Sequence, residues 1–122
     1  MKSDQQLITE TVRDYFEGWF DGDADRMERA LHPGLAKRSL GQIDRNSPEL
    51  QTTTKDRMVE LTAAGQGKGD APGGDRRIAI EIIDLYGNIA SVVVRSPVYR
   101  EYLHLVRMDG GWKIVNALWH LT

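Results

Sequence analysis

Apolar residues near the N-terminus repeat at intervals of three and four, which is the spacing of one face of an α-helix. The pattern predicts a helix over residues 3–20, with Ser3 or Asp4 at its N-cap. A second, shorter helix is expected after residues 21–23, where Asp23 can cap it, and residues 32–34 should end it. The apolar positions are Leu7, Ile8, Val12, Tyr15, Phe16, Trp19 and Phe20 in the first helix and Met27, Ala30 and Leu31 in the second.

The last third of the chain is rich in β-branched and aromatic residues, which is typical of strands. We predict strands over residues 76–86, 88–96, 99–108 and 112–121. Tight turns at residues 86–88 and 109–111 should make these strands an antiparallel meander, with Pro97 in a loop. Weaker strands are predicted at residues 35–43 and 50–53, followed by a helix over residues 55–64 that Thr54 can cap.

Residues 65–74 are rich in glycine and superficially resemble a phosphate-binding loop. Such loops follow a strand and open a helix, and the phosphate loop ends in Gly-Lys-Ser/Thr. This segment instead follows a predicted helix, leads into a strand and contains Lys68 before Gly69. We interpret it as a flexible connector, and a mobile flap over a ligand is the alternative.

The register of the final hairpin decides which side chains share a face, because a shift of one residue moves every side chain to the opposite face. A three-residue turn with Gly110 in the left-handed conformation places His104 beside Asn116, whereas a two-residue turn separates them. We favour the three-residue turn. It predicts one face with Tyr102, His104, Val106, Trp112, Ile114 and Asn116, and an opposite face with Leu103, Leu105, Val115, Ala117, Trp119 and Leu121.

Both faces of this predicted sheet are too apolar to be left in water, and the helices can cover one of them. We therefore expect a homodimer through the outer sheet face. Packing of Trp119 under a loop of a monomer is the alternative. The expected interface residues are Leu103, Leu105, Val115 or Trp119, each facing its symmetry mate.

Composition narrows the class of protein. The length of 122 residues suits a single domain, residues 1–122, and the net charge of -2 provides no basic surface for nucleic acid. The absence of cysteine rules out disulfides and thiolate chemistry and fits a reducing compartment, so the cytoplasm is the expected location. The polar N-terminus does not resemble a signal peptide, and no apolar stretch has membrane-spanning length.

Three features occur together in this chain: an aromatic end of the first helix, a Leu-His-Pro sequence that ends the second helix, and a Gly-Gly-Trp turn that leads into the last strand. They lie, together with parts of the last two strands, in residues 15–23, 31–33, 102–105, 109–116 and 118–119. In this combination almost the whole chain resembles the lumazine-binding branch of the nuclear transport factor 2-like superfamily. The resemblance implies an α+β, cystatin-like cone in which a curved antiparallel β-sheet wraps around N-terminal helices and leaves a cavity at the wide end, usually in a homodimer. Relatives include ketosteroid isomerases, scytalone dehydratase, polyketide cyclases and non-catalytic binding proteins, so the fold alone does not define the function.

Two residues are candidates for acid–base catalysis. His104 can serve as a general base or proton relay, because imidazole titrates near neutral pH, and Asn116 can orient it; a purely structural hydrogen bond is the alternative. Asp84 follows two isoleucines in an apolar strand, where burial would raise the pKa of its carboxyl group and suit it to proton abstraction. A solvated aspartate that supports the nearby turn is the other interpretation.

Aromatic residues are candidates for binding a flat ligand through stacking and hydrogen bonds, with ordinary core packing as the alternative. Lys37 and Arg38 either meet an acidic group at the cavity rim or are surface charges. The histidines at positions 32, 104 and 120 form no helical pair and no acidic cluster completes them, so we expect no metal and no cofactor. The candidate ligand-binding residues are Tyr15, Trp19, Tyr102, Trp112 and Asn116.

Three functions are compatible with these features. The first is a binding protein whose hydrophobic, partly aromatic cavity takes a small hydrophobic or aromatic ligand. The second is a cofactor-independent proton-transfer enzyme of the isomerase, dehydratase or cyclase type, acting on a small hydrophobic carbonyl compound. It would use His104 or Asp84 as base and Tyr15 or Asn116 as donor. The third is a protein-interaction module with a filled cavity.

Overall fold

The computed structural model describes residues 1–122, with the exception of the side chain of Pro72. Within this described part, three α-helices and six strands form two layers, and the strands form one sheet in the order β2-β1-β6-β5-β4-β3. The elements are α1 (Asp4–Asp21), α2 (Ala24–Ala30), β1 (Leu31–Leu40), β2 (Leu50–Thr53), α3 (Lys55–Ala63), the short 3-10 helices η1 (Gln66–Gly69) and η2 (Pro72–Gly74), β3 (Ala79–Tyr86), β4 (Ile89–Arg95), β5 (Tyr99–Met108) and β6 (Gly111–Leu121).

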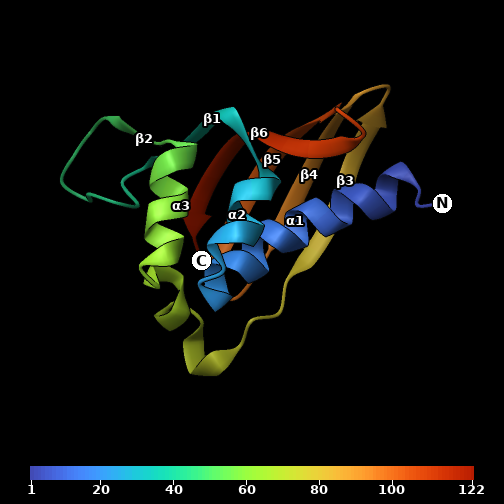
Figure 1. Cartoon of the computed structure of the whole chain (residues 1–122). Helices are drawn as coiled ribbons and strands as arrows, with labels where there is room; N and C mark the ends of the chain where they lie inside the picture. The colour runs from blue at the N-terminus through green and yellow to red at the C-terminus, as the bar shows by residue number, and fades with distance from the viewer.

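The last four strands form an antiparallel meander, as predicted from their turns. The sheet as a whole is mixed and not purely antiparallel, because β1 pairs with β6 in parallel. Helices α1 and α2 lie across one face of the sheet, and α3 stands beside them next to β1 and β2 (Figure 1). We call the helix-covered face the inner face and the opposite one the outer face.

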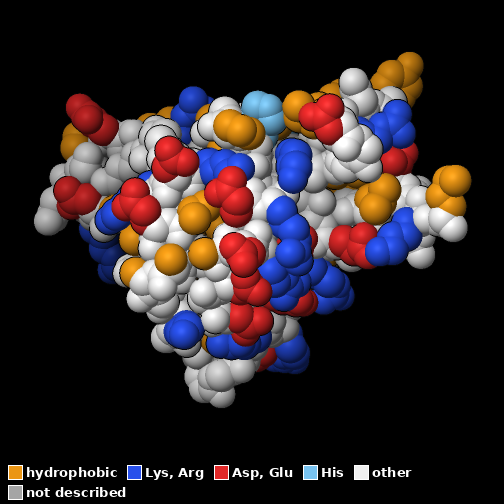
Figure 2. Space-filling view, in the orientation of Figure 1, with side chains coloured by type: hydrophobic (Ala, Val, Ile, Leu, Met, Phe, Trp, Pro, Cys, Tyr) orange, Lys and Arg blue, Asp and Glu red, His pale blue; other side chains and the backbone are white. Residues whose placement is uncertain are grey.

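All three helix starts were predicted correctly because each cap is a local interaction. Ser3 accepts a hydrogen bond from the backbone N–H of Gln6, whose side chain accepts one from the backbone N–H of Ser3. Asp23 and Thr54 cap α2 and α3 in the same way through their side-chain oxygens. On the helical side, Figure 2 shows acidic and basic side chains gathered over α1 and α2, where Arg26 bridges Asp14 and Glu17.

Two strand starts differ from the prediction by three residues or more, and β1 also ends at Leu40, not at residue 43. Strand β1 begins at Leu31, not at residue 35, because Leu31 has extended backbone angles and its buried side chain pairs beside Ile114. The pairing of β1 with β6 shifts register between Leu31 and Ala36. Pro33 lies in this stretch and has no N–H to donate. Strand β3 begins at Ala79, not at residue 76. Arg76 instead donates to the carbonyl oxygen of Phe20.

The final hairpin combines features of both predicted registers. Its turn has two residues, Asp109 and Gly110, with φ of 51° and 78°, so the favoured three-residue turn is wrong. A β-bulge at Val115 then shifts the pairing, because Leu105 faces Ile114 whereas His104 faces Asn116. The predicted pairing of His104 with Asn116 is therefore confirmed, although its cause lies inside β6 and not in the turn.

The bulge also decides which side chains face the helices. Trp112 and Ile114, before the bulge, and Ala117, after it, are all buried on the inner face. Leu103 and Leu105 belong to the same core, with 0% and 1% of their surfaces exposed, so their predicted place in an outer dimer interface is wrong. Trp119 also lies on the inner face. No helix among the described residues is long and apolar enough to cross a membrane.

Candidate functional site

A cavity of about 570 Å³ lies on the inner face, where α1, α3, β1, β5 and β6 meet. This volume is in the range of small-molecule sites. Buried polar side chains, among them Tyr15, Lys37 and Glu101, line the cavity, and aromatic side chains form much of its wall. The cavity therefore combines apolar walls with a small number of converging polar groups.

Three of these buried polar residues contact one another and form what we call the Lys37 cluster: Tyr15, Lys37 and Glu101. The Tyr15 hydroxyl lies 2.8 Å from Oε2 and 3.1 Å from Oε1 of Glu101, and Lys37 Nζ lies 3.3 Å from Oε1. Lys37 also donates a hydrogen bond to the Tyr15 hydroxyl. The cluster brings an amine, a phenol and a carboxylate together at the inner end of the cavity.

Burial changes the acid–base properties of this cluster. Burial lowers the pKa of Lys37, although the neighbouring Glu101 carboxylate acts in the opposite direction. Burial and the nearby Glu101 together raise the pKa of the Tyr15 hydroxyl well above its usual value. The Tyr15 and Trp119 rings lie 4.9 Å and 5.3 Å from Lys37 Nζ, so the amine also has two aromatic faces beside it.

Strand alternation and the helical repeat explain how these side chains meet. Tyr15 lies on the buried face of α1. Glu101 is two residues before Leu103 on β5 and thus shares its inner face, opposite Trp119 of β6. Lys37 pairs with Ala117 of β6 and points inward as well. Strand β6 thus lies between the two strands that supply the amine and the carboxylate.

The glycine-rich segment closes one side of the cavity. The indole Nε1 of Trp19 lies 3.0 Å from Oδ2 of Asp70 and 3.2 Å from the hydroxyl of Tyr99, and Tyr99 itself donates to Asp70. Burial and this bond to Asp70 raise the pKa of Tyr99. Gly67 packs directly on Trp19, with no room for a side chain. Gln66 and Asp70 of this segment thus form part of the cavity wall.

One wall residue has an unused hydrogen-bond donor. The indole Nε1 of Trp119 is buried and has no hydrogen-bond partner among the described residues. The ring of Trp119 meets that of Tyr99 edge-to-face at 5.8 Å and lines the cavity. A buried N–H without a partner is unfavourable, so a ligand oxygen that reached it would gain a hydrogen bond.

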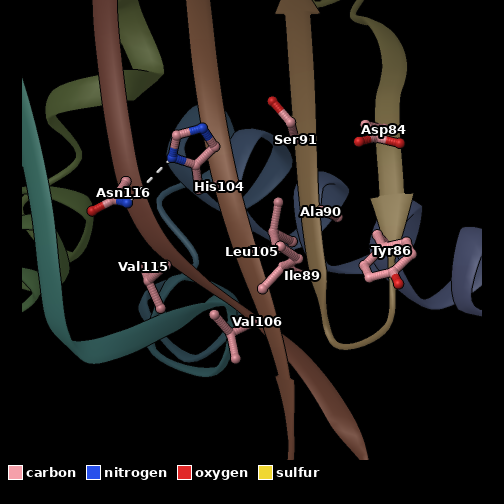
Figure 3. Close-up of a pocket in the computed structure, with 10 residues that line it drawn as sticks. All are labelled: Asp84, Tyr86, Ile89, Ala90, Ser91, His104, Leu105, Val106, Val115 and Asn116. Atoms are coloured by element: carbon pink, nitrogen blue, oxygen red, sulfur yellow. Dashed lines mark hydrogen bonds between the residues drawn. The ribbon is translucent and has the colours of Figure 1, made fainter.

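A second, smaller pocket of about 370 Å³ lies on the outer face (Figure 3). Four polar residues form a row across adjacent strands here, because Asp84 pairs with Ser91, Ser91 with His104, and His104 with Asn116. The Asn116 side-chain nitrogen lies 3.2 Å from His104 Nδ1. Ile89 and Val115 add apolar surface beside this row.

The structure thus separates the predicted site residues. Tyr15 and Trp19 line the inner cavity. His104, Asp84 and Asn116 come together in the outer pocket, on the opposite face from the position predicted for them. Asp84 is exposed, so the burial expected for it is wrong. The catalytic roles of His104 and Asp84 and the ligand-binding role of Asn116 stay predictions and would concern a ligand on the outer face.

The two other aromatic candidates also lie outside the inner cavity. Tyr102 is 52% exposed on the outer face. Trp112 is buried, and its indole nitrogen donates to Asp4 at 3.0 Å. Lys37 was predicted at the rim or the surface and is instead buried within the cavity, whereas Arg38 is exposed on the outer face.

Sequence reasoning missed Glu101 as a site residue. The available signal was a charged residue in phase with Leu103 and Leu105 on one strand face. Tyr99 lies on the same face of this strand and was also missed. In the described part of the chain, no group of three or more His, Cys, Asp or Glu side chains is placed to hold a metal ion.

The helices, the curved sheet and the inner cavity define an α+β protein of the nuclear transport factor 2-like, cystatin-like fold. Residues 3–120 match the model of the family described as "Putative lumazine-binding", and the chain belongs to this family. No match was found among curated proteins.

Solved structures agree with this fold. A protein of unknown function from Silicibacter pomeroyi DSS-3 is 19% identical over 100% of both chains, with a TM-score of 0.77. An NTF2-like protein from Cytophaga hutchinsonii ATCC 33406 is 16% identical over 99% of this chain and 100% of its own, with a TM-score of 0.71. A cystatin-like domain from Nostoc punctiforme is 13% identical over 100% of this chain and 79% of its own, with a TM-score of 0.65. At these identities the likeness concerns the fold alone.

Proposed function

We propose that this protein binds a small, flat, partly aromatic ligand in the inner cavity. The observation that carries the proposal is the Lys37 cluster at the inner end of an aromatic-walled cavity of about 570 Å³. Fully buried polar groups are costly unless they are paired or used, and here they face a space of ligand size. The cavity walls favour ring stacking, whereas the cluster favours a polar edge on the ligand.

The cluster also suggests the polarity of that edge. Lys37 and Tyr15 supply donors, Glu101 supplies acceptors, and Trp119 adds a buried indole N–H. A heterocycle with neighbouring C=O and N–H groups would satisfy both kinds of partner. Lumazine, which the family description names, is a flat bicyclic heterocycle of this kind, and it is therefore the first compound to test.

Cofactor-independent proton transfer on a carbonyl compound is a second candidate function. It is favoured by the contact between Glu101 and a tyrosine whose hydroxyl keeps its proton, since these two groups can act as base and as donor to a carbonyl oxygen. In the inner cavity Glu101 would take the role first considered for His104 or Asp84. Exchange of deuterium into the C–H bond next to the carbonyl group of a bound compound, accelerated by the unaltered protein, would distinguish catalysis from binding alone.

Native mass spectrometry tests the binding proposal directly. We expect protein purified without added ligand to carry a compound that is released on denaturation, or to bind lumazine and related flat heterocycles when they are added. Tyr15→Phe should weaken binding about 3–10-fold, because it removes one hydrogen bond. Tyr102→Phe is the matched control, since Tyr102 lies on the outer face, and it should bind normally. Empty protein that binds none of these compounds would contradict the proposal.

We further propose that the protein is a homodimer that pairs through the outer sheet face, in the cytoplasm. The outer face carries large apolar side chains that no helix covers, including Ile89, Tyr102 and Leu118, each at least half exposed. An exposed apolar surface of this kind is typical of an interface. The chain contains no cysteine, which suits a reducing compartment.

A further inference from the structure

The amine of Lys37 has fewer polar partners among the described residues than it has hydrogens. An ammonium group has three hydrogens, and Nζ has two polar partners among the described residues, the Tyr15 hydroxyl and Oε1 of Glu101. The side chain lines the cavity although only 8% of it is exposed. The Lys37 side chain therefore belongs to the surface that a ligand in the cavity would meet, and one N–H of its ammonium group has no polar partner among the described residues.

The surroundings of Lys37 differ from those of an ordinary surface lysine. Burial lowers its pKa, which increases the fraction of the neutral, nucleophilic amine at a given pH. Lys2, in contrast, has 60% of its side chain exposed. A buried lysine next to a proton donor and a proton acceptor is the arrangement that favours reaction with a carbonyl group.

We propose that Lys37 forms a Schiff base with an aldehyde or ketone group of a ligand bound in the inner cavity. This inference rests on the proposed binding function and specifies its ligand class. The Nζ lone pair forms the C–N bond while the carbonyl electron pair moves to oxygen, and a carbinolamine results. The C–O bond then breaks as C=N forms.

The residues of the Lys37 cluster can carry out every proton transfer that this reaction needs. The two hydrogens that the ammonium loses both end on the departing oxygen, so one water leaves and no oxidant or reductant is needed. Glu101, 3.3 Å from Nζ, can accept the first proton, and Tyr15, 2.8 Å from Glu101, can pass it to the oxygen. Both residues return to their starting protonation states.

The same surroundings suit the product. A protonated Schiff base carries the same positive charge as the ammonium that it replaces, so the Glu101 carboxylate remains its counter-ion. The aromatic rings of Tyr15 and Trp119, 4.9 Å and 5.3 Å from Nζ, also face a cation before and after the reaction. The reaction therefore leaves no buried charge unpaired.

Reductive trapping tests the inference. The full-length protein is incubated with 4-hydroxybenzaldehyde and sodium cyanoborohydride, and intact mass and peptide maps are recorded over time. We expect one adduct, heavier by the mass of the probe less one oxygen atom, on the peptide that contains Lys37. It should form at least about tenfold faster than adducts at Lys2 or the N-terminus.

Two arginine variants and a non-reacting probe complete the test. Lys37→Arg keeps a positive charge but should lose the fast adduct, whereas the surface variant Lys2→Arg should keep it. Labelling of exposed amines with the Lys37 peptide unmodified would overturn the inference, and this readout on the unaltered protein needs no variant. Thermal stabilisation by 4-hydroxybenzyl alcohol, which has no carbonyl, reports on binding alone. If the alcohol stabilises the protein and no Lys37 adduct forms, only the Schiff-base inference fails. If neither probe binds, the inference fails as well, and native mass spectrometry with lumazine decides separately whether the proposed binding function fails with it.

Discussion

The Nζ atom of Lys37 lies 3.3 Å from Oε1 of Glu101, and the two side chains are only 8% and 3% exposed. They come from β1 and β5, which do not touch each other in the sheet order because β6 lies between them. Removing either charge from such an enclosed pair leaves the other one buried without compensation. The stability of the folded chain and the chemistry of the cavity therefore depend on the same two residues.

Glu101→Gln should destabilise the protein by about 3–5 kcal/mol, because the Lys37 ammonium would remain buried without its counter-ion. Urea unfolding at neutral pH measures this change. Glu81→Gln provides a matched control on the sheet surface, where Glu81 pairs with Arg95 and both side chains are about half exposed. Its effect should stay within about 1 kcal/mol, because solvent screens exposed pairs.

A double variant separates the loss of the charge pair from damage to the fold. Lys37→Met together with Glu101→Gln removes both charges and should be more stable than Glu101→Gln alone by about 1–3 kcal/mol. If the double variant were as unstable as the sum of both single variants, the ion pair would not be the reason for the destabilisation.

Tyr15 should make the stability sensitive to alkaline pH. In the unfolded chain its hydroxyl loses the proton near pH 10.0, whereas burial raises the pKa of this group well above that value in the folded protein. Above pH 10 the folded state therefore holds more protons than the unfolded state. The contribution of Tyr15 to the free energy of unfolding is therefore fully present below pH 10 and is lost as the pH rises.

Urea unfolding between pH 8 and pH 11 checks this slope. Tyr15→Phe should flatten the loss of stability above pH 10, whereas the outer-face variant Tyr102→Phe should not. Lys37 has the opposite effect on the pH dependence of stability. Its pKa is lowered from 10.5, so its contribution to the free energy of unfolding increases with pH up to that value. An unchanged slope in Tyr15→Phe would show that the hydroxyl is not held protonated by its surroundings.

The sequence predicted those parts of the fold that depend on neighbouring residues. Ser3, Asp23 and Thr54 were identified as helix caps because a cap bonds to the first turn of its own helix. The bulge at Val115 was not predicted, because it depends on which residues of β5 face β6. This single extra residue changes the face of every side chain after it.

The site was harder to predict for the same reason. Tyr15 and Trp19 could be identified because the helical repeat places them beside other apolar residues. Glu101 and Lys37 meet only because β1 and β5, which are far apart in the sequence, lie on either side of β6 in the sheet. His104 and Asn116 were correctly paired, but the face on which they lie follows from the inward direction of Leu103 and Leu105.

The outer sheet face should hold the homodimer together. Tyr102 and Leu118 pair directly across β5 and β6 and are 52% and 50% exposed. Tyr102→Glu would place a charge at the centre of this face and should convert the dimer to a monomer, as measured by size-exclusion chromatography with light scattering. Ala63→Glu, on an exposed position of α3, adds the same charge elsewhere and should leave the dimer intact. A monomeric unaltered protein would contradict the proposed interface.

Gly67→Ala should damage the cavity wall selectively. A Cβ atom at this position would lie 2.6 Å from Cδ1 of the Trp19 ring and would also clash with the Trp19 carbonyl oxygen, so the helix end or the glycine-rich segment must move. We expect a loss of about 1–3 kcal/mol in the free energy of unfolding, as for other overpacked sites, together with weaker ligand binding. Gly69→Ala is the matched control, because nothing lies within 4 Å of its added Cβ, and it should leave both properties nearly unchanged. Equal effects of the two substitutions would mean that contact with Trp19 does not hold this segment against the cavity.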